Sequence, residues 1–304
     1  MADAAPRHRM TKLERADAAL GLLLILPAAA LLALVVIYPV FDLIKTGFYA
    51  LKLSEGPAAP RFIGLANFAR AWGDATLWES LRTTLILVGV TVPGALLAGL
   101  GLALLANRAV HAKWLFRLAM LMPWMLPLVF TGLLFRWFFD YKLGLVNDML
   151  TRAGFAAPQW LSSPSLAMAA ITIAIIWKTS SFVAMVLLAG LQSIPRSLYE
   201  AAEIDGAGRW SQFYEITLPM LRPAIIVALV FRTITSIQTF DIPYAMTGGG
   251  PGNSTETLAM YIQKTSIDFL DFGYGSALAT LMFLVSMAAT SFYLKYIHRD
   301  PAKA

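Results

Sequence analysis

A small set of polar and aromatic residues lies within stretches that are otherwise apolar, and these residues could contact a solute. Lys178 and Arg232 are cations well inside such stretches, and Asp241 lies near the end of one. A charge among so many apolar side chains is costly and is usually turned toward a partner or toward water. Aromatic faces can stack on the apolar faces of a solute, while amides and carboxylates accept hydrogen bonds from its hydroxyls. We therefore predict a solute pathway lined by Trp177, Lys178, Gln238, Phe240, Asp241 and Tyr244.

The same residues also have purely structural explanations. Trp and Tyr are enriched at lipid interfaces, which would account for Trp124 and Tyr244. Lys178 and Arg232 could pair with other groups or face water without touching a solute. Arg136, nearer the end of its stretch, could extend its head group toward the interface. Residue type and spacing leave both explanations open.

No set of residues predicts a chemical step. The chain has no cysteine, and its three histidines (His8, His111 and His298) lie near segment ends, so we expect no metal site. The sequence contains no GxxxxGK[ST], so we expect no ATP hydrolysis by this chain and no cofactor of its own. The glycine-rich stretch TGGGPGNST at 247–255 lacks the lysine and is typical of a flexible turn.

The elements that carry these residues are too apolar for a water-soluble protein. Of the 304 residues, 58% are apolar and only 14% charged, and the mean hydropathy is +0.66. A soluble domain has about 45–50% apolar and about 25% charged residues. The net charge of +6 does not indicate nucleic-acid binding, because Lys and Arg are scattered along the chain instead of forming one stripe. The composition therefore predicts a protein whose solvent is lipid.

Six stretches are long and apolar enough to cross a membrane, at 18–41, 83–106, 118–138, 165–190, 223–243 and 273–295. Backbone groups in hydrocarbon must be satisfied within each segment, so the fold is predicted to be all-α. The first stretch has a basic leader like that of a signal peptide. We expect it to be retained, because its apolar run is too long for one.

The distribution of cations predicts the orientation of the spans. With the N-terminus inside, the cytosolic pieces hold thirteen Lys and Arg, counting Lys295 at the end of the sixth stretch, and the longer outside loops hold eight. Both termini are therefore predicted to be cytosolic. The predicted organisation is a cytosolic segment at 1–17, a six-helix domain at 18–295 and a cytosolic tail at 296–304. In the first outside loop, GLANFARAW is typical of a short amphipathic surface helix.

The cytosolic loop at 191–222 is long and patterned. Ser193 and Pro195 predict a helix start, and Gly206 and Gly208 predict its end. A second short amphipathic helix is expected from Trp210 to Thr217, stopped by Pro219. The pattern alone fits either a helix lying on the bilayer surface or an element that docks into a partner.

The spacing of this loop resembles a family signature. Glu200-Ala201-Ala202 is followed after three residues by Gly206, and after nine more by Ile216-Thr217-Leu218-Pro219. This resembles the EAA, G, I-x-L-P pattern of the permease subunits of bacterial ABC importers at every fixed position. The flanking segments WKTSSFVAMVLLAGLQSIP and FRTITSIQTFDIPYAMTGGGPGNSTETL resemble the maltose-type sugar branch.

The resemblance implies a six-helix permease of the type I importer fold in the bacterial inner membrane. The loop would be the coupling helix that docks on the ATP-hydrolysing subunit. Small side chains would permit close approach, Glu200 would supply a charged contact, and Leu218 and Pro219 would set the exit angle into the next span. The implied coupling residues are Glu200, Ala201, Ala202, Gly206, Ile216, Leu218 and Pro219.

The resemblance also implies partners and a mechanism. The partners would be a second, different permease, two ATPase subunits that bind ATP and magnesium, an extracytoplasmic solute-binding protein, and membrane lipid. ATP-driven closure of the ATPases would open the pathway outward to receive a carbohydrate or carbohydrate-like solute. Within this class the cargo could instead be a polyol, a glycerol phosphodiester or a sulfonated sugar. A rival of another class, an ion-coupled secondary transporter, predicts inverted repeats and an intramembrane carboxylate relay.

Overall fold

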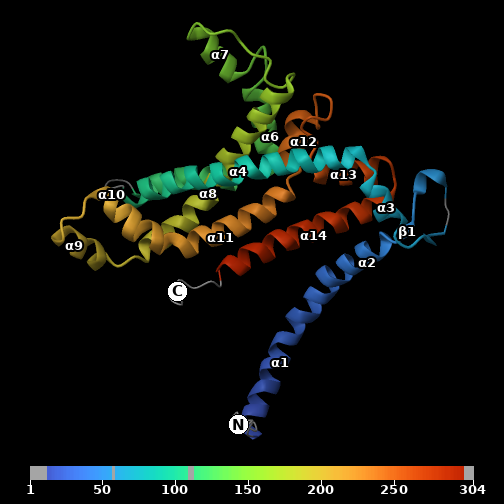
Figure 1. Ribbon diagram of the computed structural model, residues 1–304, viewed down its shortest axis with the longest axis horizontal. Helices are drawn as coiled ribbons and strands as arrows, with labels where there is room; N and C mark the ends of the chain where they lie inside the picture. The colour runs from blue at the N-terminus through green and yellow to red at the C-terminus, as the bar shows by residue number, and fades with distance from the viewer. Residues whose placement is uncertain (1–11, 57–58, 109–112, 298–304) are drawn as a thin grey trace.

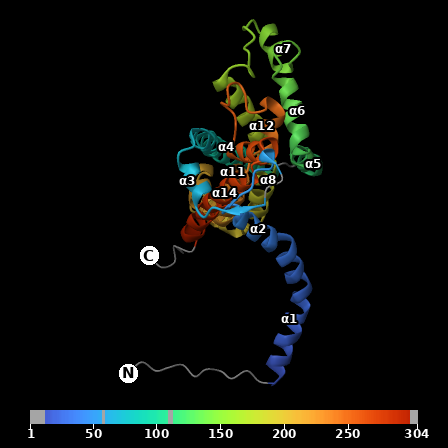
Figure 2. The ribbon, with the colours of Figure 1, turned by 90° about the vertical axis from the view of Figure 1, so that its right-hand side faces the viewer.

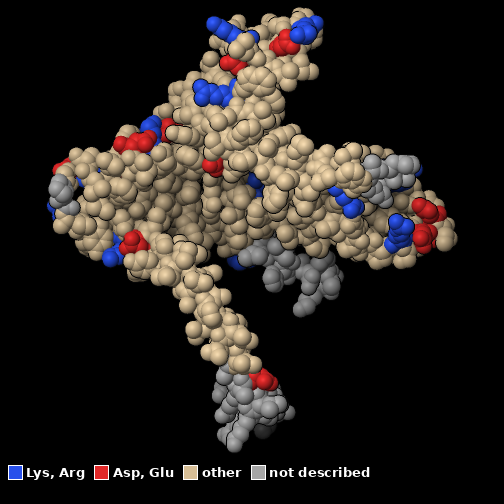
Figure 3. Space-filling model, turned by 180° about the vertical axis from the view of Figure 1, so that it is seen from behind, with Lys and Arg blue, Asp and Glu red and all other residues tan. Residues whose placement is uncertain are grey.

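Four long helices form the body of the molecule. The computed structural model describes residues 12–56, 59–108 and 113–297. In Figures 1 and 2 the four helices lie side by side: α4 (Ala75–Arg108), α8 (Pro164–Gln192), α11 (Leu218–Ile237) and α14 (Phe272–Ile297). Figure 3 shows a mostly uncharged surface along this body, with Lys, Arg, Asp and Glu gathered toward its ends. This is the arrangement expected of helices that cross a membrane.

The tightest contact in the body is between α4 and α8, because small residues let the backbones approach. Ala95, Gly99 and Ala103 follow one another at four-residue spacing on α4, and all three are buried. A Cβ atom on Gly99 would lie 2.6 Å from Val183 Cγ1 and 3.0 Å from the backbone nitrogen of Ala184. Small residues at this spacing are the usual means of close helix packing in membranes, where no hydrophobic effect draws helices together.

The first predicted span stands apart from the body. One long helix is built from α1 (Lys12–Leu32), a π-helical stretch (Ala33–Ile37) and α2 (Tyr38–Thr46), and the candidate span within it is Leu20–Thr46. Only its last part, α2, packs against the body, at α14. Figures 1 and 2 show this long helix swinging away from the other helices. Its most apolar window has no buried residue.

The third predicted span, 118–138, is not a straight helix. It consists of α5 (Lys113–Met125) and α6 (Leu128–Phe138), which meet at 95°. Pro127 is the N-cap of α6 in an extended conformation, and it cannot continue the preceding helix. The described residues therefore contain five spanning helices, or six if the bent pair counts as one. Beyond the bend, α6 leads to α7 (Leu145–Arg152) in a lateral extension (Figure 1).

Two details of the predicted loop at 191–222 were wrong. Ser193 does not start a helix: it ends α8, and its hydroxyl donates to the Gly190 carbonyl at 2.8 Å. Pro219 does not stop the second short helix. The chain runs from α10 (Arg209–Gln212) through a π-helical stretch (Phe213–Thr217) directly into α11. The π stretch shifts the hydrogen-bond register just before the residue that lacks an N–H, so the helix continues.

The ends of two predicted spans also differ. The second helix begins eight residues earlier than predicted, at Ala75 instead of residue 83. The fifth is continuous over Arg209–Ile237, whereas 223–243 was predicted. After a short break the chain forms the separate helix α12 (Asp241–Thr247). Both helices begin earlier than predicted because their first turns contain polar residues, which give no apolar signal in the sequence.

Short elements close the outer end of the body around the start of α14. They are β1 (Tyr49–Ala50), a 3-10 turn (Leu53–Glu55), β2 (Arg61–Phe62), α3 (Ala66–Trp72), α13 (Leu258–Gln263) and a π-helical stretch (Lys264–Asp268). The predicted surface helix in GLANFARAW is confirmed as α3. The predicted terminal segments lie largely outside the described residues, as do His8, His111 and His298.

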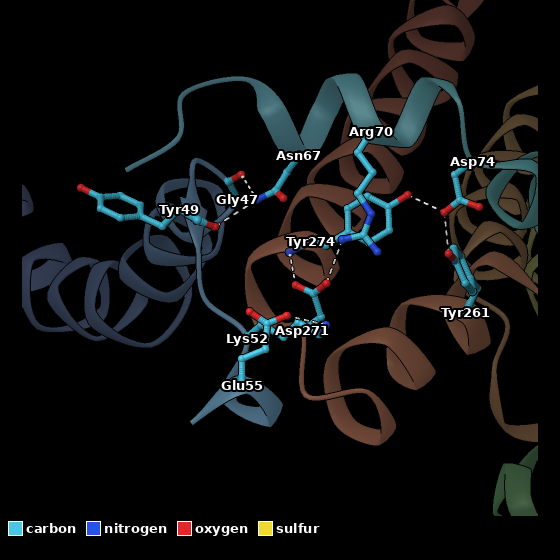
Figure 4. A network of polar contacts seen from close by, with 10 residues as sticks. All are labelled: Gly47, Tyr49, Lys52, Glu55, Asn67, Arg70, Asp74, Tyr261, Asp271 and Tyr274. Atoms are coloured by element: carbon cyan, nitrogen blue, oxygen red, sulfur yellow. Dashed lines mark hydrogen bonds and ion pairs between the residues drawn. The ribbon is translucent and has the colours of Figure 1, made fainter. Parts of the chain in front are cut away.

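A polar network ties these outer elements together (Figure 4). Asp74, just before α4, accepts short hydrogen bonds from the hydroxyls of Tyr261 and Tyr274. It also accepts the N–H groups of Thr76 and Leu77 at 2.9 and 3.3 Å, which caps α4. Burial raises the pKa of Asp74, but these hydrogen bonds outweigh burial, so its pKa lies below the ordinary value. Burial and the carboxylate of Asp74 raise the pKa of Tyr261 to about 12.

A second part of the network holds α3 against α14 (Figure 4). Arg70 forms an ion pair with Asp271 at 2.9 Å, and its guanidinium lies 3.8 Å from the ring centroid of Tyr274. Asn67 donates to the carbonyls of Gly47 and Tyr49 at 2.9 and 3.0 Å. The outer elements are thereby fixed to the body by side chains from α3 and α14.

We expect Asp74→Asn to lower the free energy of unfolding by about 1–3 kcal/mol at pH 7, because a charged acceptor of several hydrogen bonds is lost. The pKa of Asp74 is lowered in the folded state, so its contribution is complete above about pH 4 and is lost as pH falls through the folded pKa. Melting curves at pH 7 and near pH 3 should show the difference between wild type and variant narrowing in acid. Asp148→Asn, in an exposed ion pair with Arg152, should change stability by less than about 0.5 kcal/mol. A difference that persists in acid would show that the carboxylate charge contributes nothing.

Candidate functional site

The cytosolic loop presents one short helix outward. Helix α9 (Arg196–Ile204) has no buried residue and lies at the far end of the body, the end that also carries the end of α14 (Figure 1). Glu200, Ala201 and Gly206 are exposed, and Ala202 is half-buried. Ile204 is 88% exposed, an apolar side chain that sequence reasoning did not single out. Helix α9 therefore presents small side chains and one large apolar side chain outward.

The end of α9 has a defined geometry. The N–H of Ala207 donates to the Ala202 carbonyl at 2.8 Å, and the N–H of Gly206 donates to the Glu203 carbonyl at 3.1 Å. This pair of bonds is the Schellman motif, and it places Gly206 at φ +80°. The predicted helix end at Gly206 is confirmed. A Cβ atom at Gly206 would meet nothing within 4 Å, so the space around it is open to a partner.

The loop is attached firmly to the next span. The hydroxyls of Tyr199 and Thr217 are hydrogen-bonded at 2.9 Å, which joins α9 to the start of α11. Tyr199 and Ile216 pack against an apolar cluster that includes Leu187 and Leu221. Leu218 and Pro219 follow as the first residues of α11, half-buried and exposed respectively. A displacement of α9 would therefore move α11 with it.

A second candidate site is a cavity of about 400 Å³ at the bend between α5 and α6. Lys178 of α8 is buried beside it and donates to three backbone carbonyls, those of Pro123, Trp124 and Leu126, at 2.9, 2.6 and 2.5 Å. These carbonyls have lost helical partners because the helix ends there. An ammonium has three donors, so Lys178 is saturated by the bend. Its predicted role in a solute pathway stays a prediction. The three carbonyls of the bend already occupy its ammonium group.

Arg232 of α11 lies on the wall of the same cavity and is only 6% exposed. It donates to the hydroxyls of Thr235 and Ser236 at 3.0 and 2.8 Å, while its Nε has no hydrogen-bond partner within the described residues. No carboxylate of the described chain forms an ion pair with it. The rings of Phe182 and Phe231, also on this wall, pack at a centroid distance of 4.5 Å. The cavity thus combines an uncompensated cation with aromatic faces.

The other predicted pathway residues do not line this cavity. Trp177 packs on Phe135 at 5.3 Å, and Phe240 stacks on Tyr244 at 4.9 Å. Gln238 and Asp241 lie at the break between α11 and α12. Sequence reasoning missed Phe182 and Phe231, although Phe182 follows Lys178 by four residues and Phe231 precedes Arg232. The described residues contain no group of three or more acidic, His or Cys side chains that could hold a metal.

Comparison with known proteins gives a consistent result. The family described as "Binding-protein-dependent transport system inner membrane component" matches residues 95–303. The chain is 56% identical to the sulfoquinovosyl glycerol transport system permease protein SmoG of Agrobacterium fabrum, covering 94% of this chain and 92% of that one. It is 37% identical to the trehalose/maltose transport system permease protein MalF of Thermococcus litoralis, covering 94% and 96%.

Solved structures show the same fold. A bacterial ABC transporter chain involved in import of the acidic polysaccharide alginate matches with a TM-score of 0.80 at 23% identity, covering 93% of this chain and 96% of that one. A second structure of the alginate transporter, in complex with an alginate pentasaccharide-bound periplasmic protein, matches with the same TM-score at 22% identity and covers 95% and 97%.

Proposed function

This chain belongs to the family of binding-protein-dependent transport system inner membrane components, and from that membership we propose its partners and its cargo. It is a permease subunit of a bacterial ABC importer for carbohydrates or carbohydrate-like solutes, a multi-pass protein of the inner membrane. The family favours this function over the ion-coupled secondary transporter. Its partners are a second, different permease, two ATPase subunits and a solute-binding protein. The alginate transporter in complex with its periplasmic protein supports the last of these.

The exposed helix α9 is the element that docks on an ATPase subunit in this proposal. Its small residues and open space at Gly206 suit a close contact, and the bond between Tyr199 and Thr217 carries its motion into α11. ATP and magnesium are bound by the ATPase subunits, since the sequence has no phosphate-binding loop. Closure of the ATPases on ATP would turn the spans outward, and hydrolysis would return them.

The cargo is an anionic sugar derivative, most specifically a glycerol glycoside of a sulfonated sugar. The observation that carries this proposal is Arg232, a buried guanidinium without an acidic partner in the described chain, on the wall of a cavity that also presents the rings of Phe182 and Phe231. A buried cation is usually paired, so an anionic group of the solute is its natural complement. The relative named for sulfoquinovosyl glycerol, 56% identical, supports the same chemistry.

Uptake by the complete transporter in proteoliposomes, with its binding protein present, tests this proposal. We expect sulfoquinovosyl glycerol to be taken up at least about tenfold faster than glucosyl glycerol, which has a hydroxyl where the other has a sulfonate. A glycerol phosphodiester tests the alternative anion. Preference for the neutral glycoside, or for the phosphodiester, would refute the sulfonated cargo while leaving the importer function in place.

The same assay tests the role of Arg232. We expect Arg232→Gln to lower uptake of the sulfonated cargo about 10- to 100-fold, because a hydrogen-bonded charge contact of about 1.5–3 kcal/mol is lost. Arg232→Lys, which keeps the charge, should recover part of this loss. Arg136→Gln, an exposed arginine of α6 that does not line the cavity, is the matched control. Equal loss in the control would exclude a specific role for Arg232.

A further inference from the structure

A groove at the cytosolic end of α4 has no role in the function proposed above. It encloses about 490 Å³ between the last turns of α4 and the start of the helix that begins at Arg209. We propose that this groove binds an anionic phospholipid of the inner leaflet, with the phosphate on two arginines and an acyl chain along the apolar floor.

The rim of the groove is cationic. Arg108 is the last residue of α4 and Arg209 the first residue of α10, and both side chains are exposed. Within the described part of the chain neither forms an ion pair, and no acidic residue lines the groove. Guanidinium groups bind phosphate oxygens through two parallel hydrogen bonds. Two of them flanking one groove are complementary to a lipid phosphate.

The floor of the groove is apolar and open. Leu104, Leu105 and Phe213 line it, and Leu105 is 60% exposed. A Cβ atom on Gly101 would meet nothing within 4 Å, so this position leaves room along the helix. Trp210, 76% exposed, stands at the edge with its ring stacked on Tyr214 at 6.2 Å. Exposed Trp beside apolar residues is typical of the lipid–water boundary.

The position of the groove favours lipid over a protein partner. Its floor includes Gly101, Leu104 and Leu105 of α4, at the end of the predicted span 83–106, and so it lies at the cytosolic edge of the bilayer. The exposed helix α9, by contrast, carries Glu200 and Glu203 together with Arg196, whereas the groove is lined by two cations and no acidic residue. Anionic lipids are attracted to cations on the cytosolic side, and basic pockets between spans on that side bind their head groups.

Delipidated complete transporter in detergent, titrated with phosphatidylglycerol or phosphatidylcholine and followed by native mass spectrometry, tests this site. We expect wild type to retain phosphatidylglycerol at least about tenfold better than phosphatidylcholine. The double variant Arg108→Gln, Arg209→Gln should lose this preference. Gly101→Leu should weaken retention of both lipids, because it fills the floor without changing charge.

Arg222→Gln is the matched control, since Arg222 is an exposed cytosolic-side arginine that does not line the groove. It should retain phosphatidylglycerol as wild type does. Equal retention of the two lipids by wild type, or equal loss in the control, would overturn the proposal. Loss of the ATPase subunits from the double variant at fixed lipid content would also overturn it, by assigning the groove to a protein partner.

Discussion

Replacement of Gly206 by Asp should reduce uptake at least about 100-fold while the subunit itself still folds. The residue has φ +80°, which costs an L-residue about 1–2 kcal/mol, and a carboxylate held against a docked partner adds an unpaired, desolvated charge. Together these amount to about 3 kcal/mol or more, and each 1.4 kcal/mol is tenfold in binding. The measurement is uptake in proteoliposomes together with the amount of ATPase subunit that copurifies.

Two further variants separate strain from docking. Gly206→Ala introduces the strain without the charge, so its uptake should fall by about 30-fold at most. Gly208→Asp places the same carboxylate two residues away, at a position with φ −71° and open space, and should keep uptake within about threefold of wild type. If Gly206→Asp and Gly208→Asp behave alike, the assignment of α9 as the docking element is wrong.

Replacement of Lys178 by Met should destabilise the subunit by about 3–5 kcal/mol. The change removes the ammonium that holds the carbonyls of Pro123, Trp124 and Leu126 and leaves them without donors in a membrane. For a chain of this size the melting temperature should fall by about 6–15 °C. Melting of the detergent-solubilised complex, followed by loss of tryptophan fluorescence or by light scattering, measures it.

Thr179→Val is the control for this prediction. Thr179 is the next residue on α8, and its hydroxyl donates to a carbonyl of its own helix, that of Ile175, at 2.7 Å. Its replacement by an isosteric apolar residue should change the melting temperature by less than about 3 °C. If the Lys178→Met variant has the same melting temperature as wild type, the hydrogen bonds from Lys178 do not stabilise the bend.

The end of α9 could be read from the sequence because its signal is local. Gly206 predicted a left-handed helix end, and the Schellman bonds at Gly206 and Ala207 confirm it. The long apolar runs likewise predicted four helices of the body and the isolated first span. In each case the residues that carry the signal are also the residues that form the structure.

The bend and the cavity could not be predicted, because they depend on contacts between distant residues. Prolines at 123 and 127 indicated kinks, but the 95° turn is held by Lys178, more than fifty residues along the chain. The cavity brings Phe182 of one span against Phe231 of another. The helix continues through Pro219 because of a π-helical shift in hydrogen-bond register, which no residue type in the sequence predicts. The predicted roles of Glu200, Ala201, Ala202, Ile216, Leu218 and Pro219 in coupling remain predictions.

The first helix leaves most of its apolar surface uncovered by the rest of the described chain. The most apolar window of Leu20–Thr46 has a mean hydropathy of 2.9 and buries no residue in its own chain. Lipid surrounds the apolar side chains of α1, so the helix is stable in the membrane, and its last part, α2, packs against α14 of the body. Within the described chain the direction of α1 is therefore set through α2, so a partner subunit that covers α1 would complete its packing.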